Sequence, residues 1–419
     1  HRTRPPRLGP PPCPESGAMQ GGYGPPGWYV SPKARTLRCM AELDLPEMEP
    51  DADRLAHAAY FSLHEDEFRG DEPCFPFLEH LAQLVAKDHE RRWEYEGKRR
   101  LLGLDIGANI GAMTPLVIEC CGGNAGGGAV PVHVVAFEPN PANLPLLESE
   151  VRRLHTDPRL TVSVCETVAS DAAGPVSFHT NRKKNFAGNQ HGSVHHFDGE
   201  YENEDRDVQG GDASAFLDLA ADTVDHLLWG EPLKAEQAGR RRGGDGAAKG
   251  RRAGLARSAG FGGDAIVDFV KIDTEGHEWA VLLGMAETLV RTRFVFFEVS
   301  HLLRRVGVTV RKVVEWLEGL GFHTYRVGKK VVLRISGKFY HPIYETRLFW
   351  SNCLAVREDE PLAEELLRPW FSHVPRGQEG GFAHQREVLP SHLRDPALLV
   401  ELSGRAGGRA VGRGALEAV

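Results

Sequence analysis

The stretch that most constrains the fold is LLGLDIGANIG, at residues 101–111. An apolar run over 101–106 ends in a glycine turn, the pattern of a buried strand that enters a tight turn. Helix-compatible apolar residues resume over 112–121. The sequence therefore predicts a strand, a glycine-rich loop and a helix, the opening of a nucleotide-binding βαβ unit. Gly107 and Gly111 suit the loop because glycine tolerates positive φ and lets a ligand approach the backbone.

The loop differs from the dinucleotide-binding fingerprint G-x-G-x-x-G. That fingerprint needs glycine at 107, 109 and 112, whereas the chain has Gly107, Asn109 and Ala112. The form D-x-G-x-N-x-G, which begins at Asp105, resembles motif I of the class I S-adenosylmethionine (SAM) methyltransferases, as the FkbM family spells it. An NAD(P)-dependent oxidoreductase stays open as an alternative, although Asn109 and Ala112 disfavour it.

A second motif follows the apolar run over 132–137, which ends at Glu138. A carboxylate at the end of the second strand can accept hydrogen bonds from both hydroxyls of a ribose. The alternative is that Glu138 is a carboxylate at the start of a helix and has no role in binding. Asn140 and Pro141 are expected to begin the next helix, with Asn140 as its cap.

The third motif is K-I-D-x-E-G-H-E, from Lys271 to Glu278. It follows the apolar run over 266–272 and precedes apolar residues at helical spacing, which predict one helix that reaches residue 289. The motif closely resembles the fourth-strand motif of the FkbM family. The three motifs occur in the family's order, and the resemblance spans roughly residues 75–356.

The resemblance implies an α/β fold of the class I SAM-methyltransferase type. It implies a Rossmann-like sheet of seven mostly parallel strands with helices on both faces and an antiparallel C-terminal strand. We expect this domain over 51–359. Composition predicts a disordered Pro/Gly-rich basic segment over 1–50, a disordered Arg/Gly-rich insertion over 231–263, and a partly disordered tail over 360–419.

SAM is the cofactor that the resemblance implies, and its groups can be assigned to individual residues. The loop backbone at Gly107, Asn109 and Gly111 suits the carboxylate of SAM, and Asp105 can attract its ammonium group. Glu138 suits the ribose. Asp171, at the exit of an expected third strand, is the candidate for the adenine amino group, with a simple turn residue as the alternative.

The candidate catalytic residues follow the fourth strand: Asp273, Glu275, His277 and Glu278. Asp273 is expected to orient the methyl acceptor. His277 is the candidate general base because histidine titrates near neutral pH; a helix-start residue without a proton-transfer role is the alternative. The carboxylates could instead bind a divalent metal, but we assign no metal ligand.

The acceptor is expected to be an oxygen, because the Asp-Pro-Pro-Tyr or Asn-Pro-Pro-Tyr motif of many amino-group methyltransferases is absent at this strand end. We therefore expect O-methylation of a hydroxyl group. The expected acceptor is a small molecule, such as a sugar or a secondary metabolite, or a glycan or lipid. A non-catalytic protein that binds SAM or a nucleotide is a further alternative. The sequence gives no indication of the oligomeric state.

The composition of the chain limits its possible binding partners and its cellular compartment. The formal net charge of −8 disfavours nucleic-acid binding. No apolar run approaches the roughly 18 residues of a membrane span. Seven cysteines without a C-x-x-C pair suggest reduced, buried thiols and favour the cytoplasm or an organellar lumen. The first residue is His1, so we expect the natural N-terminus to be missing or processed.

Overall fold

The computed structural model describes residues 54–371, with gaps at 55–56, 59, 63, 71–73, 97–99, 124–129, 181–191, 195–214, 231–253 and 347. The expectations for the segment 1–50, for 231–253 and for the tail beyond 371 therefore fall outside the described residues. Within the described part, no helix combines the length and apolarity that crossing a bilayer requires. Five of the cysteines are described there, and all five are buried and form no disulfide bond within the described residues: Cys74, Cys120, Cys121, Cys165 and Cys353.

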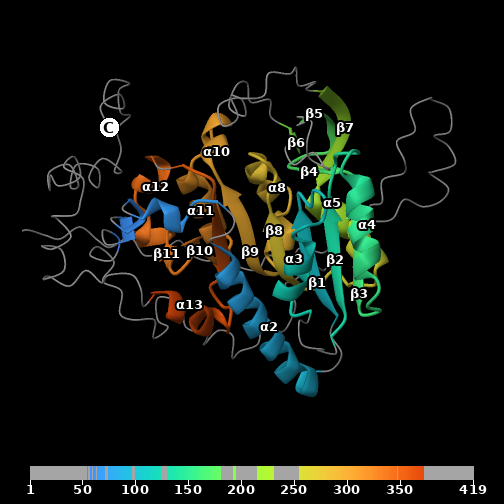
Figure 1. Ribbon diagram of the computed structural model, residues 1–419, viewed down its shortest axis with the longest axis horizontal. Coiled ribbons are helices and arrows are strands. Elements are labelled where there is room, and N and C mark those ends of the chain that lie inside the picture. Colours follow the sequence, from blue (N-terminus) through green and yellow to red (C-terminus); the bar gives the residue numbers. More distant parts are fainter. Residues whose placement is uncertain are drawn as a thin grey trace, which may run out of the picture.

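One large, mostly parallel sheet forms the centre of the molecule (Figure 1). Five parallel strands lie in the order β3–β2–β1–β8–β9, and β12 pairs antiparallel with β9. β10 and β11 complete the far edge, so the sheet has eight strands rather than the predicted seven. The bounds are β1 Leu101–Ile106, β2 Val132–Phe137, β3 Leu160–Cys165, β8 Val267–Ile272, β9 Thr292–Val299, β10 Phe322–Val327, β11 Val332–Arg334 and β12 Ser351–Arg357.

Helices cover both faces of this sheet because alternate residues of each buried strand point to opposite sides. In β1, Leu102, Leu104 and Ile106 pack into one core and Leu101 into the other. The first core includes α5 Val224–Trp229, α7 Leu255–Ser258, α8 Glu278–Leu283, α9 Ala286–Leu289, α10 His301–Arg305, α11 Val310–Gly319 and α12 Ile343–Thr346. The second includes α2 Phe75–Glu96, α3 Thr114–Cys120, α4 Leu144–Leu154 and α13 Ala363–Phe371.

A second, smaller sheet stands beside the large one, near α4 in Figure 1. Its strands are β4 Val168–Ser170, β5 Gly174–Thr180, β6 Gly192–Ser193 and β7 Ala215–Thr223, in the order β4–β7–β5–β6. The last residues of β7, Ala221–Thr223, pair with β4. The helix α5 starts only after Thr223, whose hydroxyl accepts a hydrogen bond from the His226 amide.

Two further expectations differ from the structure. The helix after β8 is broken into α8 and α9, with Gly284 at the break. The prediction of a disordered insertion over 231–263 is wrong for residues 254–263. There α7 forms, and Leu255, Ala256 and Phe261 are buried. These apolar residues are too few to show a period in the sequence, yet all three belong to the first core, where the Phe261 ring lies against His133 of β2.

Candidate functional site

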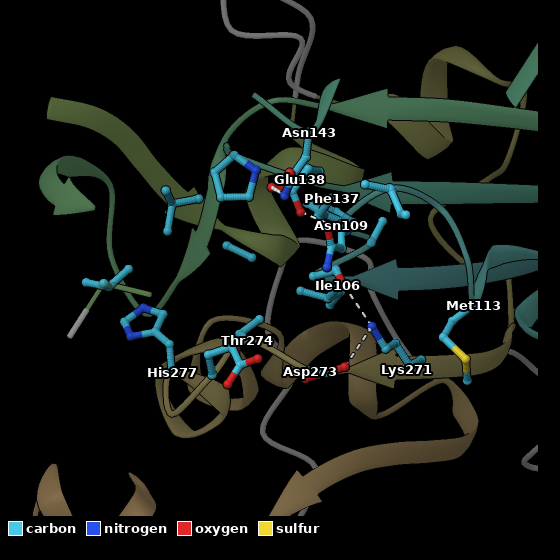
Figure 2. Close-up of a pocket in the computed structure, with 18 of the residues that line it drawn as sticks. Ile106, Asn109, Met113, Phe137, Glu138, Asn143, Lys271, Asp273, Thr274 and His277 are labelled. Carbon is cyan, nitrogen blue, oxygen red and sulfur yellow. Dashed lines mark hydrogen bonds and ion pairs between the residues drawn. The ribbon is translucent and has the colours of Figure 1, made fainter. Parts of the chain in front are cut away.

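A cavity of about 290 Å³ lies at the carboxyl ends of β1, β2 and β8 (Figure 2). Its walls are the loop after β1, the turn after β2, the turn after β8, and four residues of the smaller sheet and its ends: Val168, Ala169, Phe178 and Val194. The volume is close to the lower end of the range for small-molecule pockets, roughly 300–1,000 Å³. Ligands of open α/β sheets bind at this edge, outside the carboxyl ends of the strands.

The loop after β1 is shaped by close contact with the turn after β8. Gly107 has a φ of 79°, and a Cβ there would lie 1.8 Å from the carbonyl oxygen of Asp273. Only glycine fits at this position. The first and third sequence motifs therefore contact each other directly, through Gly107 and Asp273. The amides of Gly107 and Gly111 donate to the carbonyls of Phe137 and Ala108. These two amides therefore fix the loop, although we expected them to face the carboxylate of SAM.

Lys271 lies at the centre of the contact between the two motifs (Figure 2). Its Nζ donates to the Gly107 carbonyl at 2.8 Å and lies 3.5 Å from Asp105 Oδ1 and 3.4 Å from Asp273 Oδ2. Burial opposes the charge on Lys271, but the carboxylates of Asp273 and Asp105 outweigh burial and raise its pKa above the usual value. Sequence reasoning did not assign Lys271 a role; the signal was a lysine inside a buried apolar strand.

Asp105 lies beneath the cavity and is not among the residues that line it. The side chain is fully buried, and its Oδ2 accepts a hydrogen bond from Thr114 Oγ1 at 2.7 Å. Its other oxygen faces Lys271. The predicted contact with the ammonium group of SAM is therefore replaced by an ion pair with a lysine of this chain. Gly111 is likewise outside the lining and packs against Leu147 and Glu150 of α4.

Glu138 lines the cavity and joins two loops. Its Oε2 accepts from the Asn109 amide at 2.8 Å, and its Oε1 accepts from the Asn140 amide at 2.9 Å and from Asn143 Nδ2 at 3.3 Å. Burial raises the pKa of Glu138 to about 7. Asn140 does not cap the next helix as expected: its Oδ1 accepts from the Ala142 amide, and α4 begins at Leu144.

The turn after β8 supplies Asp273, Glu275 and His277 to the cavity. The His277 ring is buried, and its Nε2 lies 3.0 Å from Ser170 Oγ. Glu275 has a φ of 54°, and its carbonyl accepts a hydrogen bond from Ser193 Oγ of β6 at 2.8 Å. These contacts attach the turn to the smaller sheet and set the direction of its side chains.

Glu278 and Asp171 do not line the cavity. Glu278 is buried inside the turn, where its Oε1 accepts from the Thr274 and Gly276 amides and from Thr274 Oγ1. Burial raises the pKa of Glu278 to about 7. Through these hydrogen bonds the Glu278 carboxyl group closes the turn. Asp171 is exposed and accepts a hydrogen bond from Ser170 Oγ at 3.2 Å.

The structure therefore brings together six of the predicted residues: Gly107, Asn109, Glu138, Asp273, Glu275 and His277. Sequence reasoning missed the apolar wall formed by Phe137, Val168 and Phe178, which no motif marks. Within the described residues, no group of three or more histidine, cysteine, aspartate or glutamate side chains could hold a metal ion.

Comparison with known proteins identifies part of this architecture. No curated protein matches the chain. Residues 258–324 match the model of the Methyltransferase FkbM domain. The match includes β8, the turn after it and β9, and thus Lys271, Asp273 and His277, while the loop after β1 and Glu138 lie outside it. This match confirms the resemblance of the chain to the FkbM methyltransferase family and supports a methyltransferase.

Proposed function

We propose that the protein is a SAM-dependent methyltransferase of the class I fold that methylates a hydroxyl group. One observation carries the proposal: the loop after β1, Glu138 at the end of β2 and the turn after β8 line one cavity. These segments lie far apart in the sequence and meet at the edge of the sheet where α/β folds bind nucleotides. The antiparallel β12 beside β9 also suits the fold that the family resemblance implies.

The polar groups of the cavity fit SAM. Asn109 Oδ1 is buried and has no hydrogen-bond partner among the described residues, so it can accept from an ammonium group. Glu138 Oε2 accepts one hydrogen bond from the chain, and a carboxylate oxygen can accept a second, for example from a ribose hydroxyl. Phe137, Val168 and Phe178 offer an apolar surface for a planar base.

The acceptor side of the reaction falls to the turn after β8. SAM, when bound, supplies an activated methyl group. Asp273 faces the cavity and can hold an acceptor hydroxyl by accepting its hydrogen bond, while Lys271 fixes the carboxylate from behind. The contact with Ser170 Oγ orients the His277 ring, which can take the hydroxyl proton as general base. Such a site suits a hydroxyl of a sugar, lipid or secondary metabolite.

Calorimetric titration with SAM tests the proposal, with Glu138→Ala as the diagnostic variant. Loss of the carboxylate should weaken binding by about 1.5–3 kcal/mol, the range for hydrogen bonds to a charged group. Asp171→Ala is the matched control, because Asp171 is an exposed carboxylate outside the cavity lining. Its affinity should equal that of the wild type.

The same titration separates the alternatives. Equal SAM affinity of a folded Glu138→Ala variant and the wild type rejects the ribose assignment. Quenching of nicotinamide fluorescence, without SAM binding, would favour an NAD(P)-dependent oxidoreductase. SAM binding without methyl transfer from labelled SAM to any fraction of a cell extract would favour a non-catalytic binding protein.

A further inference from the structure

Glu298 is a buried carboxyl group that the proposed mechanism does not use. It lies near the end of β9, directly after Phe297, and Phe297 is in register with Ile272 of the parallel strand β8. Asp273 follows Ile272 in the same way, so the two acidic residues occupy neighbouring positions on adjacent strands. On its other side Glu298 faces Asn352 of β12. Glu298 is only 4% exposed.

The carboxyl groups of Glu298 and Asp273, at neighbouring positions of adjacent strands, lie within reach of a hydrogen bond to one another. Two ionised carboxylates cannot form one, because each only accepts; one member of the pair must carry a proton. Since like charges at this distance cannot both ionise at little cost, such a pair holds one proton between its two members. The remaining question is which carboxyl group keeps the proton.

The surroundings place the proton on Glu298. The Asp273 side chain is 35% exposed and lies 3.4 Å from the ammonium group of Lys271, so it has both solvent and a cation beside it, whereas Glu298 is buried. The charged groups with the largest effect on Glu298 are Asp273, Glu275 and Glu278, all acidic, and its neighbour Asn352 on β12 is uncharged. Burial, reinforced by these carboxylates, raises the pKa of Glu298 well above its usual value.

The second oxygen of Glu298 agrees with this assignment. Its Oε1 is buried and has no hydrogen-bond partner among the described residues. A buried ionised oxygen without a donor is far more costly than the carbonyl oxygen of a neutral acid.

We propose that Glu298 is a positioning residue that acts as a neutral acid and donates a hydrogen bond to the ionised carboxylate of Asp273. Asp273 is then held from two sides, by Lys271 and by Glu298. This arrangement fixes the oxygen that Asp273 presents to an acceptor in the cavity. The inference rests on the proposed function, because it assigns Asp273 the task of orienting the acceptor.

The first test is the pH dependence of thermal unfolding in the full-length chain and in Glu298→Gln. A raised folded-state pKa gives a stability contribution that is complete below the unfolded pKa of about 4.3 and is lost as pH rises toward the folded pKa. Glutamine is isosteric, stays neutral and can still donate to Asp273. The melting temperature of the wild type should therefore fall relative to that of Glu298→Gln as pH rises from 5 to 9, by several degrees.

Glu287→Gln is the matched control, because Glu287 is exposed on α9 and its replacement should leave the pH dependence unchanged. A wild type that gains stability over Glu298→Gln as pH rises would show that Glu298 is ionised in the folded chain. That result overturns the proposal.

Infrared spectroscopy gives a direct second readout on the wild type itself. A protonated carboxyl group absorbs in a region separate from carboxylates, so the wild type at pH 7 should show a band that Glu298→Gln lacks. Identical spectra in this region contradict the proposal. Both readouts need no ligand. Failure of the wild type to bind S-adenosylhomocysteine would overturn the proposed function, while these two results would still report on the carboxyl pair.

Methyl transfer distinguishes positioning from packing. In the extract fraction that supports transfer from labelled SAM, Glu298→Gln should keep turnover, because the donor is retained. Glu298→Leu removes the donor, and a misplaced catalytic group can cost about 10²-fold in rate. A glutamine variant as slow as the leucine variant, while both bind S-adenosylhomocysteine normally, would contradict a neutral donor at this position.

Discussion

At the scale of single residues, the site depends on a buried lysine more than on any residue that touches solvent. Lys271 neutralises Asp105 on β1, holds Asp273 at the cavity, and donates to the carbonyl of Gly107. A buried cation remains charged only where acidic partners compensate for its desolvation. The lysine therefore couples the loop after β1 to the turn after β8, and we expect both segments to lose their geometry without it.

Lys271→Met should destabilise the protein by about 3–5 kcal/mol, because it leaves two buried or half-buried carboxylates without their cation. It should also weaken SAM binding, since the Gly107 loop loses its anchor. Denaturant unfolding and calorimetry measure the two effects. Lys338→Met is the control at an exposed lysine and should change stability by less than about 0.5 kcal/mol. Equal losses for the two variants would show that Lys271 is not energetically linked to the carboxylates.

At the scale of secondary structure, the sequence predicts elements whose signal is local. The strands predicted at the apolar runs 101–106, 132–137 and 266–272 are confirmed as β1, β2 and β8. The helix α11 carries a similarly local signal, because the Thr309 hydroxyl at its start accepts from the Lys312 amide. Local pattern and local capping determine these elements, so no tertiary information is needed.

The missed features depend on contacts between distant segments. The break between α8 and α9 follows from the approach of Gly284 to β4, and the burial of 254–263 follows from a core that other segments supply. For the same reason the motifs identified Glu138 and Asp273 as site residues, but they did not show that Glu278 is turned into its own loop. The exposure of Asp171 likewise depends on how β4 ends, which no local pattern reveals.

Gly284 offers a test of this tertiary contact. A Cβ at residue 284 would lie 1.8 Å from the carbonyl oxygen of Ser170, which the backbone cannot accommodate without moving α8 away from β4. Gly284→Ala should therefore cost about 1–3 kcal/mol, as overpacking does. It should also disturb the contact of Ser170 with His277.

The control for Gly284→Ala is Gly319→Ala at the end of α11, where a Cβ meets no atom within 4 Å. That variant should gain about 0.5–1 kcal/mol, because alanine loses less entropy than glycine in a helix. Thermal unfolding compares the two. Equal and small changes would mean that α8 is free to move relative to β4.

At the scale of the whole molecule, the two edges of the large sheet have different tasks. The carboxyl edge carries the cavity, whereas the amino edge holds a buried cluster of charges around Arg293, at the start of β9. Its guanidinium contacts Glu360 at 2.9 and 2.7 Å, Asp88 at 3.2 Å and Asp268 at 3.6 Å. Asp268 also accepts a hydrogen bond from the Leu102 amide of β1.

This cluster extends the folded body beyond residue 359, where we expected the domain to end. Glu360 precedes α13, and α13 packs beside α2 in the second core, as Figure 1 shows at the lower edge of the molecule. Arg293 thus joins α2, two central strands and the segment before α13. Residues as far apart in the sequence as Asp88 and Glu360 therefore contact the same guanidinium group.

Arg293→Met should therefore be among the most destabilising substitutions at the amino edge, at about 3–5 kcal/mol, because it leaves several buried carboxylates without a cation. Arg152→Met is the matched control: Arg152 is exposed on α4, with a 3.7 Å contact to Glu148, and surface pairs contribute about 0–1 kcal/mol. Denaturant unfolding measures both. The affinity of Arg293→Met for SAM, measured where the variant is still folded, should stay near that of the wild type, since the cluster lies at the edge opposite the cavity. A selective loss of SAM affinity with unchanged stability would show that the two edges are coupled in binding and not only in folding.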